Sequence, residues 1–177
     1  MEESTTQRRT LYQGRVVGLE LHDVRLPDGR TALREIVRHA PAVAVIAELP
    51  DGRFALVRQY RKPVERTVLE VVASIREPGE TAVEAARREL LEETGYSAVT
   101  LTRLGTCYPS PGYVDEQIDL FHAQLAREPV ATSLDEDENV CMECYTSTEI
   151  SAMIDRGEIQ DAKTLLAWFW WQRERSV

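Results

Sequence analysis

The segment from residue 74 to residue 96 carries six glutamates, and two of them, Glu92 and Glu93, follow Glu89 by three and four residues. On a helix this spacing places all three carboxylates on one face. Like charges at such separations repel, whereas a divalent cation such as Mg²⁺ binds carboxylate oxygens and removes that penalty. These residue types therefore favour metal-assisted chemistry. Taken alone, the three glutamates also fit the solvated acidic face of a structural helix.

A helix beginning near Thr81 would position these carboxylates. Glu84 stands three residues after Thr81, which is the pattern of a capping box. Gly95 is placed to end the helix in the left-handed conformation. Glu80 lies at the start of the helix, where a carboxylate complements the helix dipole, and this structural role competes with a catalytic one. The expected buried stripe consists of Val83, Ala86 and Leu90.

Hydrophobic patterning predicts mostly strands in the first two thirds of the chain. The continuous apolar run at 42–49 is typical of a central strand buried on both faces, and a Pro-Asp-Gly turn follows it. The expected strands are 14–26, 31–39, 42–49, 53–61, 67–73, 99–108, 117–125 and 140–145, and two later helices lie near 148–156 and 161–173. This content predicts an α+β domain with a mixed sheet.

The bulk composition excludes some partners. The chain has 177 residues and a formal net charge of −9, which argues against a general nucleic-acid or anionic-membrane surface. The polar start MEESTTQRRT lacks the apolar core of a signal peptide, and no apolar run is long enough to span a membrane. Three cysteines give no disulfide framework, which fits a reducing cytoplasm, although Cys141 and Cys144 form a single CxxC with zinc or redox use as the alternative.

The glutamate-rich segment resembles the signature of the Nudix hydrolases. That pattern is Gly, five residues, Glu, seven residues, Arg-Glu-apolar, one residue, Glu-Glu, one residue, Gly-apolar. The positions that match it are Glu80, Arg88, Glu89, Leu90, Glu92, Glu93, Gly95 and Tyr96. Ser74 stands where the family has Gly, and we expect a side chain there to strain the turn by about 1 kcal/mol.

Further segments resemble the ADP-ribose and nucleoside-diphosphate-sugar branch of that family. They are HAPAVAVIA, LVRQYR at 56–61, YPSPGYVDE and the acidic DEDE at 135–138. Pro111 lies 15 residues past Tyr96, as a proline does in that branch. The resemblance implies a Nudix-like α/β/α sandwich over residues 41–177, preceded by an N-terminal antiparallel strand region over residues 1–40. It also implies a homodimer in which the N-terminal strands contribute to substrate binding.

The resemblance also assigns roles to residues. It implies Mg²⁺, with Mn²⁺ as an alternative, held mainly by Glu89 and Glu93 and assisted by Glu92 and the carbonyl of Ala73. Arg88, four residues before Glu92, can orient the carboxylates. The general base is expected in the acidic loop, at Glu138 or, as second choice, Glu136. Without the resemblance that loop reads as a solvated acidic segment.

Substrate phosphates require positive charge, which Arg58 and Arg61 can supply from the same strand. The resemblance implies that Glu116 contacts the terminal ribose. The substrate-binding residues expected from the resemblance are Arg34, Arg58, Arg61, Glu70, Pro111, Gly112 and Glu116.

The expected activity is metal-dependent hydrolysis of ADP-ribose or a related nucleoside-diphosphate sugar. Two alternatives remain at this point. One is the same chemistry on GDP-mannose, FAD or a dinucleoside polyphosphate, and the other is a Nudix-like sensor that binds a nucleotide without turnover.

Overall fold

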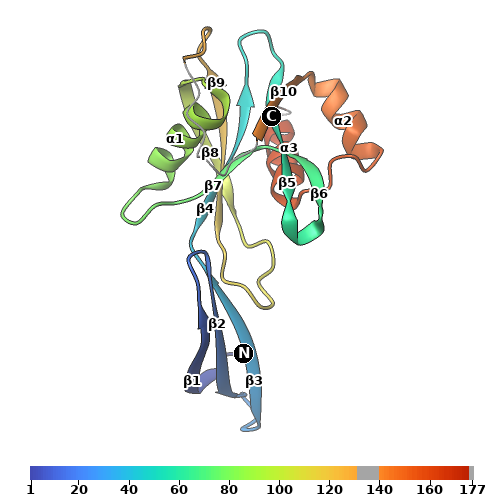
Figure 1. Ribbon diagram of the computed structural model, residues 1–177. Coiled ribbons are helices and arrows are strands. Elements are labelled where there is room, and N and C mark those ends of the chain that lie inside the picture. The colour runs from blue at the N-terminus through green and yellow to red at the C-terminus, as the bar shows by residue number, and fades with distance from the viewer. Residues whose placement is uncertain (131–139, 176–177) are drawn as a thin grey trace. The chain divides into compact units, whose positions relative to one another are not determined.

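Figure 1 shows the computed structural model of the chain, which describes residues 1–130 and 140–175. The chain forms two compact units. One comprises residues 1–41 and 108–117, and the other comprises residues 42–107 and 118–177. None of the described helices is both long and apolar enough to cross a membrane.

The first unit is a three-stranded antiparallel sheet in the order β1-β2-β3, built from β1 (Ser4–Gln13), β2 (Val17–Arg25) and β3 (Thr31–His39). The segment 113–115 runs beside β3, where the Val37 amide donates to the Tyr113 carbonyl at 2.7 Å and the Asp115 amide donates to the Val37 carbonyl at 3.2 Å. The loop that follows β8 (Ala98–Cys107) is therefore part of this unit rather than a free connection.

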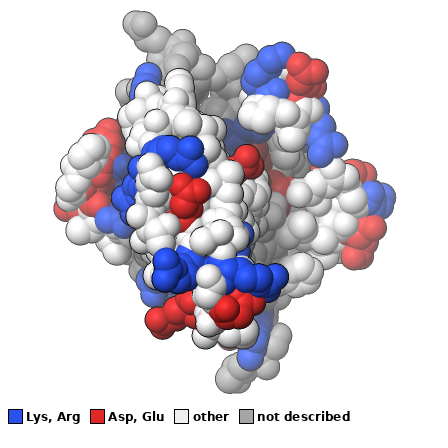
Figure 2. Space-filling model, turned by 90° about the horizontal axis from the view of Figure 1, so that it is seen from below, with Lys and Arg blue, Asp and Glu red and all other residues white. Residues whose placement is uncertain are grey.

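Arginines on this sheet lie beside carboxylates. Arg9 pairs with Asp23, and Arg34 pairs with Glu3. Figure 2, which views the molecule from below, shows positive and negative side chains interspersed on that face. Because opposite charges alternate at short range, this face presents both signs to any approaching ligand.

The second unit is organised around a seven-stranded mixed sheet. Its main path runs β10-β5-β4-β9-β8, with β6 paired to β5 and β7 paired to β4. The β4–β9 pair is parallel, and the other pairs are antiparallel. The strands are β4 (Ala42–Glu48), β5 (Phe54–Arg61), β6 (Arg66–Glu70), β7 (Val72–Ile75), β8 (Ala98–Cys107), β9 (Ile118–Leu125) and β10 (Val140–Tyr145). A short 3₁₀ turn, η1 (Lys62–Val64), joins β5 to β6.

Helices cover both faces of this sheet, as Figure 1 shows: α1 (Ala82–Thr94) on one side, and α2 (Ser147–Asp155) and α3 (Ala162–Glu174) on the other. Strand β4 serves both layers because its side chains alternate. Val43 and Val45 belong to the α1 layer, and Ala44 and Ile46 belong to the α3 layer. The expected α+β sandwich with a mixed sheet is confirmed.

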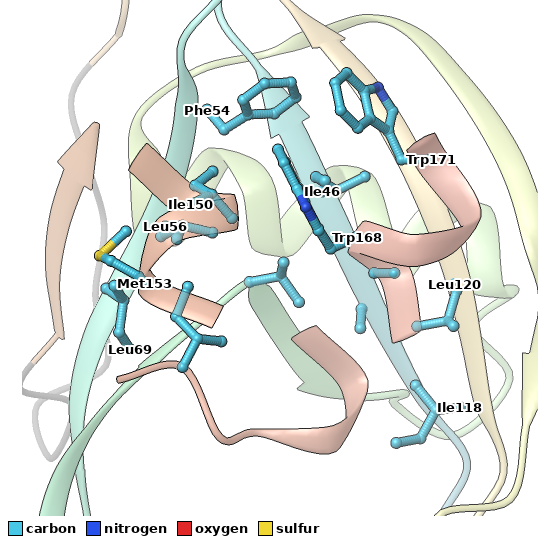
Figure 3. Packing of buried hydrophobic residues seen from close by; sticks show 14 of the residues in the cluster. Ile46, Phe54, Leu56, Leu69, Ile118, Leu120, Ile150, Met153, Trp168 and Trp171 are labelled. Carbon is cyan, nitrogen blue, oxygen red and sulfur yellow. The ribbon is translucent and has the colours of Figure 1, made fainter. Parts of the chain in front are cut away.

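Two tryptophans of α3 build the larger core layer (Figure 3). Trp168 stacks on Trp171 with ring centroids 4.8 Å apart, and Phe54 meets both rings edge-on at 5.2 and 4.6 Å. Trp170 covers β8 at Gly105, where an added Cβ would lie 2.5 Å from its ring. Gly105 is therefore required by this close approach.

Two local expectations were wrong. The single strand expected at 67–73 is two strands, because β6 pairs with β5, β7 pairs with β4, and the chain passes from one to the other at Val71. Val83, expected in the buried stripe of α1, is exposed. Its place in that stripe is taken by Ala85 and, unexpectedly, by carboxylates.

Candidate active site

Helix α1 begins and ends as its sequence indicates. The Glu84 amide donates to the Thr81 hydroxyl at 3.2 Å, and the Thr81 amide donates to the Glu84 carboxylate at 2.8 Å, which completes the capping box. Gly95 ends the helix at φ 74°, and its amide donates to the Leu91 carbonyl. These local contacts fix where the helix begins and ends. Which of its residues face the sheet depends on the pattern of buried side chains.

That buried face carries two glutamates. Glu89 is 3% exposed and Glu93 is 6% exposed, and they lie in line with the buried Ala86 and Leu90. Burial of a carboxylate is costly unless a cation or several hydrogen bonds compensate it. An amphipathic helix ordinarily places apolar side chains at such buried positions.

Arg88 draws the acidic side chains together. Its guanidinium donates to Glu80 at 2.9 and 3.2 Å, to Glu89 at 2.7 Å and to Glu92 at 2.8 Å. The hydrogen bonds to Glu80 are the main cause that raises the pKa of Arg88, and the same bonds lower the pKa of Glu80. Arg88 therefore forms an ion pair with Glu80 and fixes the direction of the Glu89 and Glu92 carboxylates that it contacts.

The oxygen-rich donor set fits Mg²⁺ or Mn²⁺, which prefer carboxylate and carbonyl oxygens. In the parts of the chain that the structure describes, no three acidic, histidine or cysteine side chains are grouped ready to hold an ion. Glu89 and Glu92 are instead turned toward Arg88. Binding of a cation to Glu89 would therefore exchange an arginine contact for a metal contact.

Ser74 does not strain the backbone, contrary to expectation. It lies within β7, paired with Val43 of β4, and its hydroxyl donates to the Ile75 carbonyl at 3.2 Å. The left-handed residue of the following loop is Gly79, with φ 86°. The turn thus comes later than expected, and a side chain at position 74 fits an extended strand. The neighbouring Ala73 pairs with Ala44.

Glu70 is held by two cationic side chains. It is buried, accepts two hydrogen bonds from Arg61 at 2.8 and 2.7 Å, and also accepts one from Lys163 on α3. Burial acts to raise its pKa, but Arg61 and Lys163 outweigh burial and lower it. Arg61 and Glu70 were expected near the substrate, and the structure brings them together as one pair.

Lys163 was missed by the sequence reasoning. It lies in the first turn of α3, where a positive charge opposes the helix dipole. That unfavourable placement is the signal that could have identified it. Lys163 also contacts Asp161, whose carboxylate caps the helix through the Thr164 amide at 2.9 Å.

Arg58 pairs with Glu143 of β10 through two hydrogen bonds, at 2.7 and 2.9 Å. Arg58 and the Tyr145 hydroxyl lower the pKa of Glu143 to about 2 from 4.5. This pairing contributes stability that is fully present above pH 4.5 and is lost as the pH falls through about 2.

Glu143→Gln is therefore expected to lower the free energy of unfolding at pH 7 by about 1 kcal/mol, since both side chains are partly screened by solvent. Urea denaturation should show this difference at pH 7 and a much smaller one near pH 2. A difference that stays constant across this pH range would contradict the assignment of Glu143 as the titrating group.

The remaining expected residues are not placed relative to α1. Arg34, Pro111, Gly112 and Glu116 belong to the first unit. There Arg34 pairs with Glu3, and Glu116 lies 3.8 Å from the His39 ring. Glu136 and Glu138, expected to supply the general base, lie outside the described residues.

Comparison with known proteins places this geometry in context. The model of the NUDIX domain matches residues 38–169. ADP-ribose pyrophosphatase of Bacillus subtilis is 41% identical over 168 residues, covering 94% of this chain and 91% of that protein. Methanol dehydrogenase activator of Bacillus methanolicus is 43% identical over 167 residues, covering 94% and 90%. The crystal structure of an ADP compounds hydrolase superposes with a TM-score of 0.87 at 24% identity, covering 98% of this chain and 94% of that one, which shows a shared fold.

Proposed function

We propose that this chain, which belongs to the Nudix hydrolase family, cleaves the pyrophosphate bond of ADP-ribose or a related nucleoside-diphosphate sugar. The products are a nucleoside monophosphate and a sugar phosphate. The observation that carries the proposal is the pair of buried carboxylates, Glu89 and Glu93, on the sheet-facing side of α1. The similarity to an ADP-ribose pyrophosphatase over nearly the whole chain supports the substrate class.

The chemistry follows from charge. A pyrophosphate is anionic and repels an attacking hydroxide, and a bound Mg²⁺ or Mn²⁺ neutralises that charge and acidifies water. Glu89, Glu92, Glu93 and the carbonyl of Ala73 would hold the cation. When the cation replaces the contacts between Arg88 and the metal-binding glutamates, Arg88 would stay in place because it keeps its hydrogen bonds to Glu80.

The other residues act on the substrate and on the proton. Arg58 and Arg61 would attract the phosphates, and each is held in direction by a carboxylate, Glu143 or Glu70. Glu138, with Glu136 as second choice, would take the proton of the attacking water. From the first unit, Arg34, Pro111, Gly112 and Glu116 would contact the nucleotide and the terminal ribose.

Two further properties belong to this proposal. The first is a homodimer formed through the first unit: β1 is exposed along its whole length and is the terminal strand of its sheet, an arrangement that favours pairing with another chain. Sedimentation should give twice the chain mass. The second is a cytoplasmic location, which is supported by the free thiols of Cys141 and Cys144.

Incubation of the purified protein with ADP-ribose and Mg²⁺ is expected to yield AMP and ribose 5-phosphate, separated by chromatography. Omission of the metal or addition of a chelator should abolish both products. A parallel panel of GDP-mannose, FAD and a dinucleoside polyphosphate, ranked by kcat/KM, identifies the preferred substrate. Tight calorimetric binding of ADP-ribose in the presence of Mg²⁺, with no product from any substrate, would overturn the proposal in favour of a sensor.

A further inference from the structure

Arg76 closes the loop that leads from β7 into α1. Its Nε and Nη2 atoms both donate to the backbone carbonyl of Glu80, at 3.2 and 2.7 Å. The Glu80 amide donates to the Glu77 carbonyl, and the Glu77 amide donates to the Glu80 carboxylate, each at 3.0 Å. The residue just before the helix cap is thus held through its carbonyl, its amide and its side chain.

Glu80 is connected to the glutamates of α1 through Arg88. Its carboxylate receives two hydrogen bonds from Arg88, whose Nη1 atom donates to Glu89 and Glu92. Because the guanidinium is a rigid plane of donors, the position of Glu80 sets the direction from which Arg88 meets Glu89. A cation bound by Glu89 would compete with that contact, and Arg88 would then depend on its other partners to stay in place.

A buried negative charge lies on the same side of the sheet. Val43 of β4 pairs with Ser74 of β7 on one side and with Asp119 of β9 on the other. Cross-strand neighbours share a face, and Val43 belongs to the layer that α1 covers. Ser74 and Asp119 therefore both face the catalytic helix, and Arg76 follows Ser74 by two residues.

Asp119 keeps its charge in that position. It is 5% exposed and accepts hydrogen bonds from Thr106 at 2.6 Å and from Arg103 at 2.8 Å. Burial acts to raise its pKa, but these two donors and the positive charge of Arg76 outweigh burial and lower it. Arg103 is the direct ion-pair partner of Asp119, and the half-buried Arg76 adds an attraction over a longer distance.

We propose that Arg76, with Asp119 as its buried counter-charge, is a positioning residue for the metal-binding face of α1. Arg76 holds Glu80, Glu80 holds Arg88, and Arg88 then stays clear of Glu89 when a divalent cation occupies that carboxylate. Both residues act through Glu80 rather than on the reacting atoms. The inference rests on the proposed metal-dependent function and extends it to two residues whose types the family signature does not specify.

The direction of the effect follows from competition between Arg88 and the cation. When Arg76 is lost, Glu80 is less firmly held, so Arg88 is freer to follow Glu89 and to compete with the metal. Residues that orient metal ligands from outside the coordination sphere typically change metal affinity by about 10- to 100-fold. We expect Arg76→Ala and Asp119→Asn each to weaken Mn²⁺ binding by about tenfold.

Isothermal titration calorimetry measures the Mn²⁺ affinity directly, with Mn²⁺ as the only ligand and no nucleotide present. The double variant should weaken binding by much less than the product of the two single effects, because both residues act on one link. Arg53→Ala is the matched control, since Arg53 is also an arginine held by local contacts, here to Asp51 in the β4–β5 turn. It should leave the Mn²⁺ affinity unchanged. Thermal unfolding without metal reports whether each variant is folded. If Arg76→Ala does not fold, Asp119→Asn still tests the inference, because it preserves the shape of the side chain.

The outcomes separate this inference from the proposed function. Wild-type protein that binds Mn²⁺ and turns over ADP-ribose, together with folded variants that bind Mn²⁺ as tightly as wild type, overturns the positioning role alone. A purely structural role would give the same affinities with lowered unfolding temperatures. Wild-type protein that does not bind Mn²⁺ overturns both.

Discussion

Glu93→Gln is expected to lower kcat/KM for ADP-ribose by about 10²- to 10³-fold, the range measured when one charge-stabilising group is removed from a preorganised site. Glutamine has nearly the same shape as glutamate but carries no charge and is a weaker ligand for a hard cation. Glu93 lies on the buried face of α1, one turn after Glu89, which is also buried. A glutamine there leaves the helix intact and removes half of that pair of charges.

Two measurements distinguish loss of the metal site from loss of the fold. The free energy of unfolding without metal should fall by no more than about 1 kcal/mol, because the substitution removes a buried charge rather than packing volume. Mn²⁺ affinity should fall along with activity. The matched control is Glu84→Gln, the same substitution on the exposed side of the same helix, where glutamine can still complete the capping box. Full activity of Glu93→Gln on every diphosphate tested would show that the metal site is assigned to the wrong residues.

Trp168→Ala is expected to lower the free energy of unfolding by about 3–5 kcal/mol, the usual cost of truncating a buried aromatic side chain. Trp168 is 2% exposed and packs against both Trp171 and Phe54, so its loss leaves a cavity that neighbouring rings cannot readily fill. A typical domain has only about 5–15 kcal/mol of stability in total. This single change therefore brings the protein close to its unfolding threshold at room temperature.

Phe169→Ala is the control for that experiment. Phe169 is the next residue on α3 and is 56% exposed, so its truncation should change stability by about 0.5 kcal/mol or less. Urea denaturation followed by tryptophan fluorescence would be distorted by the lost indole, so circular dichroism is the suitable probe. Equal denaturation midpoints for the two variants would show that α3 does not form the core in solution.

The ends of α1 could be predicted because local contacts set them. Thr81, Glu84 and Gly95 act within a few residues of the backbone groups that they satisfy. Of its buried face, Ala86 and Leu90 were predicted and are buried, but Glu89 and Glu93 occupy positions that a hydrophobic pattern reserves for aliphatic side chains. Val83 was predicted to lie in the buried stripe because it is apolar, but it is exposed.

Features that depend on strand pairing could not be predicted from the sequence. The break at Val71 arises because β6 and β7 pair with different strands, and Ser74 is unstrained because β7 continues past it. The contact between Lys163 and Glu70 joins segments far apart in the chain, as does the common face of Ser74 and Asp119. Each requires the register of the sheet, which no short window of residues contains.

The parallel pairing of β4 with β9 has a consequence for how the chain folds. Ala42 lies beside Ile118, so the centre of the sheet closes only after the β5–β8 region, α1 included, has been synthesised. Contacts of such long sequence separation slow folding because the chain must close a large loop before they form. Until then one edge of an apolar strand stays open, and a chain stalled before β9 is expected to aggregate.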